Sequence, residues 1–385
     1  MKKTLFVIPT LNLGGSVTSL LNLLELLDAS GNRADLFVLE HTGVFLERAK
    51  KCANLLPESK KLASVLCRSS DLKKYGIKGF LNRCLASLKY KLFSPSRVRD
   101  QIYRKVARTI KEYDTVVAYQ ESISTQFTQF IPAKKRIAWV HTMYDRFAGE
   151  HDKMLSLYSN FESVVCVAPA AADAFKAGLP ELKDRVLCIP NTLNPTAIQE
   201  KSLLYEFDTP QKETNVIVSV GRLSPEKQYD HAILAAKKLN EQGVDFTWYI
   251  IGEGKEKEKL TSLIEETNLT SKVILLGGKE NPYPIIAKAD VLVISSLYEA
   301  QPMVANEALI LNVPVITTDY PSAKTLINHN TNGLICENST EGIACALYAF
   351  FTEKTLKDAL KTGAKEFTYD TQSILERIFS LCSID

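Results

Sequence analysis

The stretch that decides the fold of this chain covers residues 297–314 and reads LYEAQPMVANEALILNVP, directly after ADVLVISS at 289–296. The upstream segment predicts a buried parallel strand, because its apolar run is short, rich in β-branched residues and ended by small polar residues. We expect a helix to follow from Met303 to Leu311, since a proline suits the turn before it and an asparagine follows it. The first N–H groups of such a helix have no acceptor within the helix.

The start of this helix is a predicted phosphate site, because free N–H groups and the helix dipole both attract negative charge. Glu299 precedes the helix, and Glu307 lies roughly 6 Å beyond Met303 along its axis at the usual rise per residue. Carboxylates on both sides of a phosphate accept hydrogen bonds from paired hydroxyl groups, which suits a nucleotide diphosphate sugar. The alternative interpretation is that Glu299 caps the helix and Glu307 is a solvated helical residue.

The same segment resembles the signature of the retaining GT-B glycosyltransferases of family four, in which seven residues separate two glutamates. At Ala300 members of that family commonly have glycine, so the backbone beside the ligand has less freedom here. The resemblance implies an α/β protein of the GT-B type, with two Rossmann-like, doubly wound parallel-sheet domains facing a central cleft. Further matching stretches are NPYP at 281–284, AD at 289–290, SSLYE at 295–299, NEAL at 306–309 and VPVI at 313–316.

Strand and helix patterns alternate along the whole chain, which by itself predicts doubly wound parallel sheets. Residues 191–214 are polar, contain prolines and lack a period, so we expect a linker there. The domains expected are an N-terminal, acceptor-side domain at 1–190 and a C-terminal domain at 215–365 that binds the nucleotide sugar. In the family resemblance, a C-terminal helix at 366–385 folds back on the first domain.

The segment GRLSPEK at 221–227 follows the first predicted strand of the second half. It resembles the family's pair of basic residues at the diphosphate, and Arg222 and Lys227 would stabilise the charge of the leaving nucleoside diphosphate. No Asp-x-Asp occurs in the chain, so a carboxylate pair that holds a divalent metal is not indicated. We expect a metal-independent site with no cofactor besides the donor substrate. As isolated residues, Arg222 and Lys227 would more often be solvated surface charges, but their position after a strand of the second half favours function.

Three further positions complete the candidate site. Gly15 lies between the first predicted strand and a helix, where backbone approaches a phosphate or sugar closely, although a tight turn explains it equally well. His141 follows the strand predicted at 136–140 and resembles the family histidine that contacts the donor sugar, while a lone histidine is more often structural. Lys279 precedes the segment where the family reads the nucleobase, with uridine the first expectation from family frequency. The candidate catalytic residues are His141, Arg222, Lys227 and Glu299; the candidate donor-binding residues are Gly15, Gly221, Arg222, Lys227, Lys279, Gln301, Pro302, Met303, Val304 and Glu307.

The net charge of +3 hides a basic region at residues 68–111, which contains 13 Lys and Arg residues and two Asp residues. Leu81, Leu85, Leu88 and Leu92 repeat there at helical spacing, and a second apolar stripe follows at residues 98–110. Two basic amphipathic helices of this kind suit anionic lipid headgroups, and two ordinary surface helices explain the pattern equally well. Nucleic acid is disfavoured, because the region has no recognition motif.

The composition is that of a globular protein, and its eight scattered cysteines include no Cys-x-x-Cys pair. Pro9 interrupts the first apolar run, which argues against a signal peptide, and no run is long enough to span a bilayer. We therefore expect a cytoplasmic location, peripheral at the inner face of the plasma membrane if residues 68–111 bind lipid.

The function expected is retaining transfer of a sugar from a UDP-sugar to a hydroxyl of a glycan or lipid-linked acceptor in cell-surface polysaccharide synthesis. Retention is implied by the resemblance alone, and front-face attack is favoured because no carboxylate is clearly placed as a nucleophile. A catalytically silent nucleotide-sugar-binding module and transfer to a soluble or protein acceptor stay open. A nucleotide-dependent oxidoreductase or epimerase is disfavoured, because its Gly-x-Gly-x-x-Gly fingerprint is missing.

Overall fold

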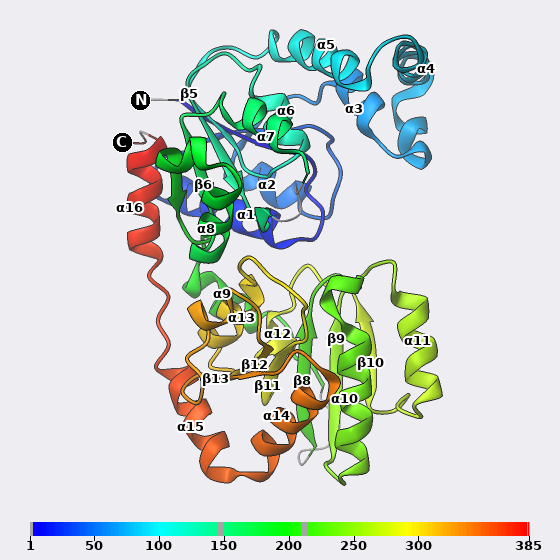
Figure 1. Cartoon of the computed structure of the whole chain (residues 1–385), viewed down its shortest axis with the longest axis vertical. Helices are drawn as coiled ribbons and strands as arrows, with labels where there is room; N and C mark the ends of the chain where they lie inside the picture. The colour runs from blue at the N-terminus through cyan, green and yellow to red at the C-terminus, as the bar shows by residue number, and fades with distance from the viewer. Residues whose placement is uncertain (1–2, 145–148, 209–213, 383, 385) are drawn as a thin grey trace. The chain divides into compact units, whose positions relative to one another are not determined.

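The computed structural model describes residues 3–144, 149–208, 214–382 and 384 (Figure 1). Its backbone contacts divide the chain into two compact units. The first comprises Met1–Thr192 and Gln372–Asp385, and the second comprises Leu193–Thr371. Each unit is built on one parallel β-sheet with helices around it, so the predicted α/β class with two Rossmann-like domains is confirmed.

The first unit contains a seven-stranded sheet in the order β3-β2-β1-β4-β5-β6-β7, with every pair parallel. The order reverses between β1 and β4, because the chain builds outward from β1 first on one side and then on the other. The central strands are mostly apolar, as expected where a sheet is covered on both faces, and all five residues of β1 are buried. The strands are β1 (Thr4–Ile8), β2 (Asp35–Val38), β3 (Asn54–Leu55), β4 (Tyr113–Ala118), β5 (Ala133–Val140), β6 (Ser163–Cys166) and β7 (Val186–Cys188).

The helices of the first unit include the C-terminal helix, which returns to this sheet (Figure 1). Thr115 Oγ1 of β4 donates a hydrogen bond to the Cys382 carbonyl at 3.0 Å, and Lys135 Nζ of β5 donates to the Leu381 carbonyl at 2.7 Å. The helices are α1 (Gly15–Ala29), α2 (Leu46–Cys52), α3 (Lys60–Leu66), η1 (Ser69–Tyr75), α4 (Gly76–Leu92), α5 (Pro95–Ala107), α6 (Ile123–Thr128), α7 (His151–Tyr158), α8 (Pro169–Gly178), η3 (Pro180–Arg185) and α16 (Thr371–Cys382).

The second unit contains a six-stranded parallel sheet in the order β10-β9-β8-β11-β12-β13, which reverses between β8 and β11. Successive residues of β8 pack on opposite faces: Ile217 joins the core beneath α10 and α14, and Val218 joins the core beneath α12 and α13. The strands are β8 (Asn215–Val220), β9 (Phe246–Ile251), β10 (Val273–Gly277), β11 (Val291–Ile294), β12 (Val315–Thr318) and β13 (Gly333–Cys336). The helices are α9 (Pro195–Ser202), η4 (Pro225–Lys227), α10 (Tyr229–Glu241), α11 (Lys257–Glu266), α12 (Tyr283–Ile286), α13 (Met303–Ile310), η5 (Ala323–Thr325), α14 (Thr340–Thr352) and α15 (Lys354–Lys365).

The segment predicted as a linker, 191–214, contains a helix instead of an irregular chain. Helix α9 begins after Asn194, whose side-chain oxygen accepts the Ala197 N–H at 3.1 Å, and Pro195 occupies its first turn. Ile198 of this helix is buried in the core of the second unit, and the division between the units falls after Thr192. The polar composition suggested irregular chain, although the segment contains a helix N-cap residue followed by a proline. Residues 209–213 of the predicted linker lie outside the described part of the chain.

Candidate functional site

The site of the second unit lies where its strand order reverses. In open α/β sheets, ligands bind outside the carboxyl ends of the strands at such a switch point. The chain leaves β8 at Gly221 and leaves β11 at Ser295, and these two strands are neighbours in the sheet. The predicted residues Arg222, Lys227 and Glu299 all follow one of these two strands, so the fold brings together residues that are more than seventy positions apart in the sequence.

Lys227 and Glu299 form the central ion pair of this site. Lys227 Nζ pairs with Glu299 Oε1, and Ser296 Oγ donates a hydrogen bond to the same oxygen at 2.7 Å. The two charged side chains are 22% and 15% exposed, so the pair is partly shielded from water but reachable from it. An ammonium group carries three N–H donors, and one carboxylate oxygen uses only one of them. The arrangement therefore holds a cation in a fixed place while leaving donor capacity for an anionic ligand.

Buried hydroxyl groups fix the loop that carries Glu299. Ser322 Oγ donates to the Glu299 carbonyl at 2.8 Å, and Thr318 Oγ1 donates to the Ser296 carbonyl at 2.6 Å. Ser295 Oγ donates to the Lys227 carbonyl at 2.7 Å and so ties this loop to the segment after β8. No motif in the sequence indicated these supporting residues. Their only signal was a small hydroxyl side chain at or just after the end of a strand.

Helix α13 is observed at Met303–Ile310, which confirms the helix predicted from this stretch to within one residue. Its N-cap is Pro302, and no side chain caps it, so the interpretation of Glu299 as the capping residue is wrong. The side chains of Pro302 and Met303 are buried, whereas Gln301 and Val304 are partly exposed. What the start of this helix offers a ligand is therefore mainly backbone N–H groups.

Glu307 lies on the buried side of α13, with only 7% of its surface exposed. Its Oε1 accepts a hydrogen bond from the Tyr283 hydroxyl of α12 at 3.0 Å. The interpretation of Glu307 as a solvated helical residue is therefore wrong. A buried carboxylate costs free energy unless it is hydrogen-bonded, so its position is built by α12 as well as by α13.

Gly221 is required by the packing of the site. A Cβ atom at Gly221 would lie 2.8 Å from Tyr229 Oη, and one at Gly252 would lie 1.8 Å from the Gly221 carbonyl oxygen. Close backbone contact between the loops after β8 and β9 thus explains the glycines of the segment GEG at 252–254. Arg222 is exposed, and its guanidinium makes no ion pair with the described residues. Lys279 is also exposed, but it follows the edge strand β10, which β9 separates from β8.

The two candidate site residues of the first unit, Gly15 and His141, each follow a strand of its sheet. Gly15 is the exposed first residue of α1, which follows β1 at the reversal point between β1 and β4. His141 follows β5, and its N–H donates to Glu121 Oε2 at 3.0 Å. The ring Nε2 lies 3.0 Å from the Tyr119 carbonyl oxygen, so Nε2 carries the proton. Burial lowers the pKa of His141, although the Glu121 carboxylate opposes that shift, and the imidazole is neutral near pH 7.

The protein has two parallel sheets with one switch point each, and a cation is paired with a carboxylate at the switch point of the second sheet. This is a Rossmann-like, two-domain protein of the GT-B class. Comparison with known proteins finds a family that is similar to part of the chain. Residues 205–367, most of the second unit, match the model of the family described as glycosyl transferases group 1. This part of the chain is similar to that family.

Relatives of known name share parts of the chain. An uncharacterized glycosyltransferase of Methanocaldococcus jannaschii is 26% identical over 249 residues, which is 59% of this chain and 61% of that protein. N-acetylgalactosamine-N,N'-diacetylbacillosaminyl-diphospho-undecaprenol 4-alpha-N-acetylgalactosaminyltransferase of Campylobacter jejuni is 36% identical over 39% of this chain and 42% of its own length. The lipopolysaccharide core biosynthesis glycosyltransferase LpsD of Rhizobium meliloti is 24% identical over 68% and 72% of the two chains. The matches thus span about two fifths to seven tenths of these relatives.

Solved structures share the fold over the whole chain. The structure of Anabaena HepE in complex with UDP-glucose has a TM-score of 0.75 at 16% identity and covers 100% of both chains. A variant of Staphylococcus aureus TarM in complex with UDP has a TM-score of 0.72 at 16% identity and covers 99% of both chains. At these identities the likeness shows the fold, and the site must be argued from the residues of this chain.

Proposed function

We propose that this chain is a glycosyltransferase that moves a sugar from a UDP-sugar to a hydroxyl of a glycan or lipid-linked acceptor in cell-surface polysaccharide synthesis. The observation that carries the proposal is the fixed Lys227–Glu299 pair at the switch point of the unit that matches the group 1 family model. The relatives named for lipopolysaccharide core synthesis and for a diphospho-undecaprenol acceptor support the acceptor class. The neighbours that hold UDP or UDP-glucose support the choice of donor.

In this proposal, different residues of the second unit bind different parts of the donor. Arg222, Lys227 and the first N–H groups of α13 bind the diphosphate, because all of them offer positive charge or N–H donors. Glu299 accepts hydrogen bonds from hydroxyl groups of the sugar, and Glu307 accepts them from the ribose. The roles of Gly15, His141 and Lys279 stay predictions from the family resemblance.

The proposed reaction breaks the bond between the anomeric carbon and the phosphate oxygen while the acceptor oxygen bonds to the same face of the sugar. Negative charge develops on the departing diphosphate, and Lys227 and Arg222 stabilise it from positions set before the reaction. Because the new bond forms on the face that the phosphate leaves, the configuration at the anomeric carbon is retained. The leaving phosphate oxygen takes the proton of the acceptor hydroxyl. The positive charge at the diphosphate comes from the protein's own basic residues, without a metal ion.

The test is a transfer assay in which the full-length protein meets a panel of UDP-, GDP-, ADP- and dTDP-linked sugars with glycan and lipid-linked acceptors. We expect turnover with a UDP-sugar, an unchanged rate in excess EDTA, and an α-linked product from an α-linked donor by NMR. A product of opposite anomeric configuration contradicts retention, and loss of the rate in EDTA contradicts metal independence. If no donor turns over and Glu307→Ala binds UDP as tightly as the unaltered protein does, the enzyme and its nucleotide site are both rejected.

A further inference from the structure

Helix α4, at Gly76–Leu92, turns its apolar side away from the protein. Its exposed apolar face consists of Ile77, Leu81, Leu85, Leu88 and Leu92, whose side chains are between 53% and 81% exposed. On a helical projection these five positions fall within an arc of about 80°, at 100° per residue. The buried residues of the helix, Gly79 and Ala86, project on the opposite side. A surface helix of a globular protein normally has the reverse orientation.

The neighbouring helix α5 shows the normal orientation. Val98, Tyr103 and Val106 of α5 are buried, and its basic residues Arg104 and Lys105 are exposed. The sequence predicted the same kind of amphipathic helix in both places. The interpretation as an ordinary surface helix fits α5, and it fails for α4.

The contacts on the inner side of α4 fix its rotation. A Cβ atom at Gly79 would lie 2.3 Å from Tyr75 Cβ and 3.3 Å from Ser64 Cβ, so only glycine fits against α3 and η1 there. Arg83 Nη1 donates a hydrogen bond to the Cys67 carbonyl at 2.7 Å and ties the middle of α4 to the end of α3. Gly79, Ala86 and Arg83 therefore face the protein, and the five large apolar side chains face outward.

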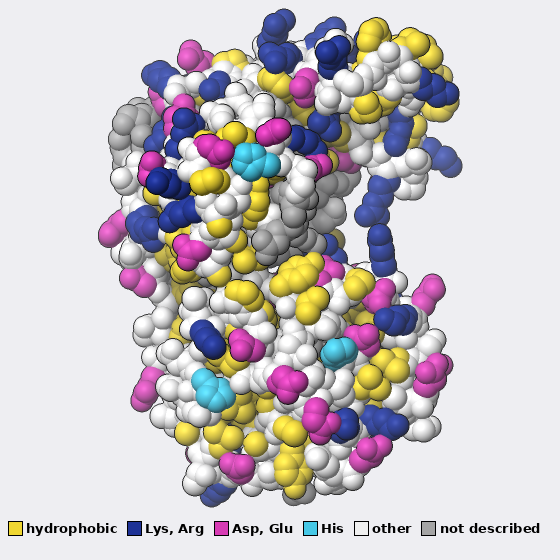
Figure 2. All heavy atoms as spheres, viewed as in Figure 1, with side chains coloured by type: hydrophobic (Ala, Val, Ile, Leu, Met, Phe, Trp, Pro, Cys, Tyr) yellow, Lys and Arg dark blue, Asp and Glu magenta, His cyan; other side chains and the backbone are white. Residues whose placement is uncertain are grey.

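Positive charge surrounds this apolar face. Helix α4 carries four basic residues and no acidic one, within the region 68–111 that has 13 basic and two acidic residues. On the same projection Lys78 and Lys89 border one edge of the apolar arc and Lys91 borders the other. Figure 2 shows hydrophobic side chains gathered where Figure 1 places α4, with lysine and arginine side chains beside them.

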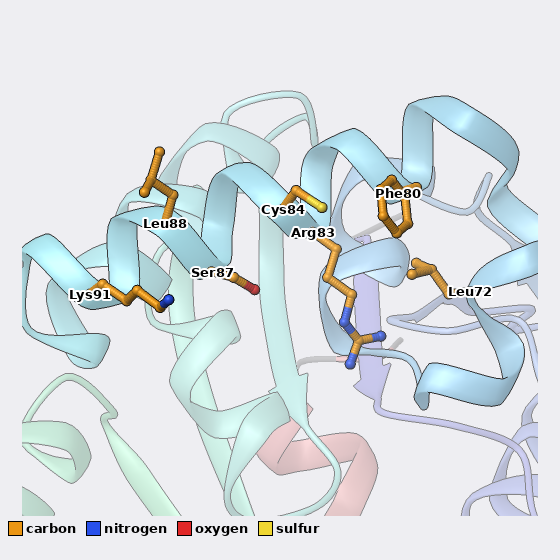
Figure 3. Close-up of a pocket in the computed structure, with 7 residues that line it drawn as sticks. All are labelled: Leu72, Phe80, Arg83, Cys84, Ser87, Leu88 and Lys91. Carbon is orange, nitrogen blue, oxygen red and sulfur yellow. The ribbon is translucent and has the colours of Figure 1, made fainter.

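A hollow of about 390 Å³ opens beside the apolar face, between α4 and η1 (Figure 3). Leu72, Phe80 and Leu88 give it apolar walls, and Arg83 and Lys91 give it positive charge. Figure 3 shows Phe80 and Leu72 facing one another at one end and Lys91 at the other. The hollow thus continues the combination of apolar and cationic side chains that the helix presents outward.

We propose that α4 docks on an anionic lipid bilayer and lies in the plane of its interface. The exposed apolar face would enter the boundary between headgroups and acyl chains, and Lys78, Lys89 and Lys91 would reach the lipid phosphates. The charge selects a bilayer over a second copy of the chain, since a symmetric dimer through α4 would bring two strongly basic surfaces together. The apolar residues occupy one side of the helix only, which suits a helix lying on a membrane rather than crossing one. This docking is independent of the proposed sugar transfer.

The experiment measures sedimentation of the full-length protein with vesicles of phosphatidylglycerol and phosphatidylcholine. We expect binding at low salt, loss of most of it in pure phosphatidylcholine, and weakening at about 1 M salt, where the Debye length is about 3 Å. The variant Leu81→Ser/Leu85→Ser/Leu88→Ser should bind at least about tenfold more weakly, because interfacial affinity scales with buried apolar area. Replacing Lys78, Lys89 and Lys91 together by Gln should cost about fivefold per lysine.

The matched control is Leu203→Ser/Leu204→Ser, which removes two exposed leucines of the second unit. It should bind vesicles as the unaltered protein does. Equal binding by the α4 leucine variant and this control overturns the proposal. So does a concentration-dependent dimer, seen by light scattering, that the α4 leucine variant abolishes, because a second copy then covers the face.

A fluorescent probe gives a second readout. The two natural tryptophans, Trp139 and Trp248, are fully buried, so they report little of a membrane contact. Leu88→Trp should shift its emission to the blue on vesicle addition and be quenched by lipids brominated along the acyl chain, while Leu203→Trp should show neither change. An unshifted Leu88→Trp signal on vesicles that bind the protein places the contact elsewhere and overturns the docking of α4. Because vesicle binding needs no donor, failure of the transfer assay leaves this result unaffected.

Discussion

The switch points of the two units share one topology and differ in chemistry. In both sheets the chain order reverses next to the first strand, between β1 and β4 in one unit and between β8 and β11 in the other. The second unit places an ion pair there, Lys227 with Glu299, whereas the first unit places a neutral, buried hydrogen bond between Ser19 Oγ and Tyr119 Oη at 2.9 Å. The same backbone plan thus carries a partly exposed ion pair in one unit and a buried hydroxyl pair, followed by the Glu121 carboxylate, in the other. The topology sets where such side chains gather, and their chemistry sets which ligand they suit.

The largest expected effect comes from removing the cation of the second unit. Lys227→Met should lower the transfer rate by about 10²–10³-fold, because a preorganised charge that stabilises a developing anion is worth that much. The measurement is the rate of UDP release with donor and acceptor at saturation. Lys255→Met is the control, since Lys255 is an exposed lysine of the same unit outside this site. Equal rates for the two variants would remove Lys227 from the proposed mechanism.

The glycines that follow the first strands should respond unequally. Gly221→Ala should destabilise the protein by about 1–3 kcal/mol, because the new Cβ would lie 2.8 Å from Tyr229 Oη in a packed site. Gly14→Ala should cost much less, since a Cβ there meets no described atom within 4 Å. Thermal or urea unfolding measures both changes.

A double variant sharpens this comparison. The variant Gly221→Ala/Tyr229→Phe lacks the oxygen that opposes the new Cβ, so it should recover part of the lost stability. A double-mutant cycle with the two single variants separates this recovery from the cost of Tyr229→Phe alone. A strictly additive cycle would mean that the hydroxyl of Tyr229 is not what excludes a side chain at position 221.

A smaller effect is expected at the buried carboxylate. Tyr283→Phe removes the hydroxyl that donates to Glu307 Oε1 at 3.0 Å, so the affinity for UDP should fall by about threefold to tenfold through a less well positioned carboxylate. Glu307→Ala should weaken UDP binding more than Tyr283→Phe does, because it removes the proposed ribose acceptor itself. Calorimetric titration with UDP measures both. If Tyr283→Phe is the weaker binder of the two, Tyr283 acts on the nucleotide by another route.

The smallest expected effect concerns the pH dependence of stability in the first unit. Burial lowers the pKa of His141 below its usual value of 6.5, so the unfolded chain binds a proton at a higher pH than the folded chain does. The free energy of unfolding should therefore fall as pH drops below about 6.5, and stay level above it with respect to this group. His141→Gln should show a shallower fall between pH 7 and pH 5 in urea unfolding. His41, whose pKa burial also lowers, contributes equally to both proteins. Parallel stability curves for the two proteins would contradict the buried, neutral state of His141.

The prediction from sequence was strongest where local pattern and fold agree. The strand at 289–296 and the helix after it were predicted because a short β-branched run and a proline-led apolar stretch have few other stable conformations. The alternation of such patterns was enough for the α/β class. The prediction from sequence was weakest at 191–214, where composition suggested a linker and the structure has α9. A short helix contributes little period to the sequence, and its burial depends on a core formed by distant strands.

Hydrophobic period and turn chemistry act over a few residues, so they predict the class of fold and the residue types of the candidate site. Which residues meet is set by the tertiary structure: Lys227 lies beside Glu299, Tyr283 donates to Glu307, and Glu121 accepts the backbone N–H of His141. The tertiary structure also decides that α4 exposes the apolar stripe that α5 buries, although both stripes look alike in the sequence. A period shows that a helix has an apolar side. Which way that side points depends on what fits behind it, and behind α4 the position of Gly79 leaves no room for a side chain.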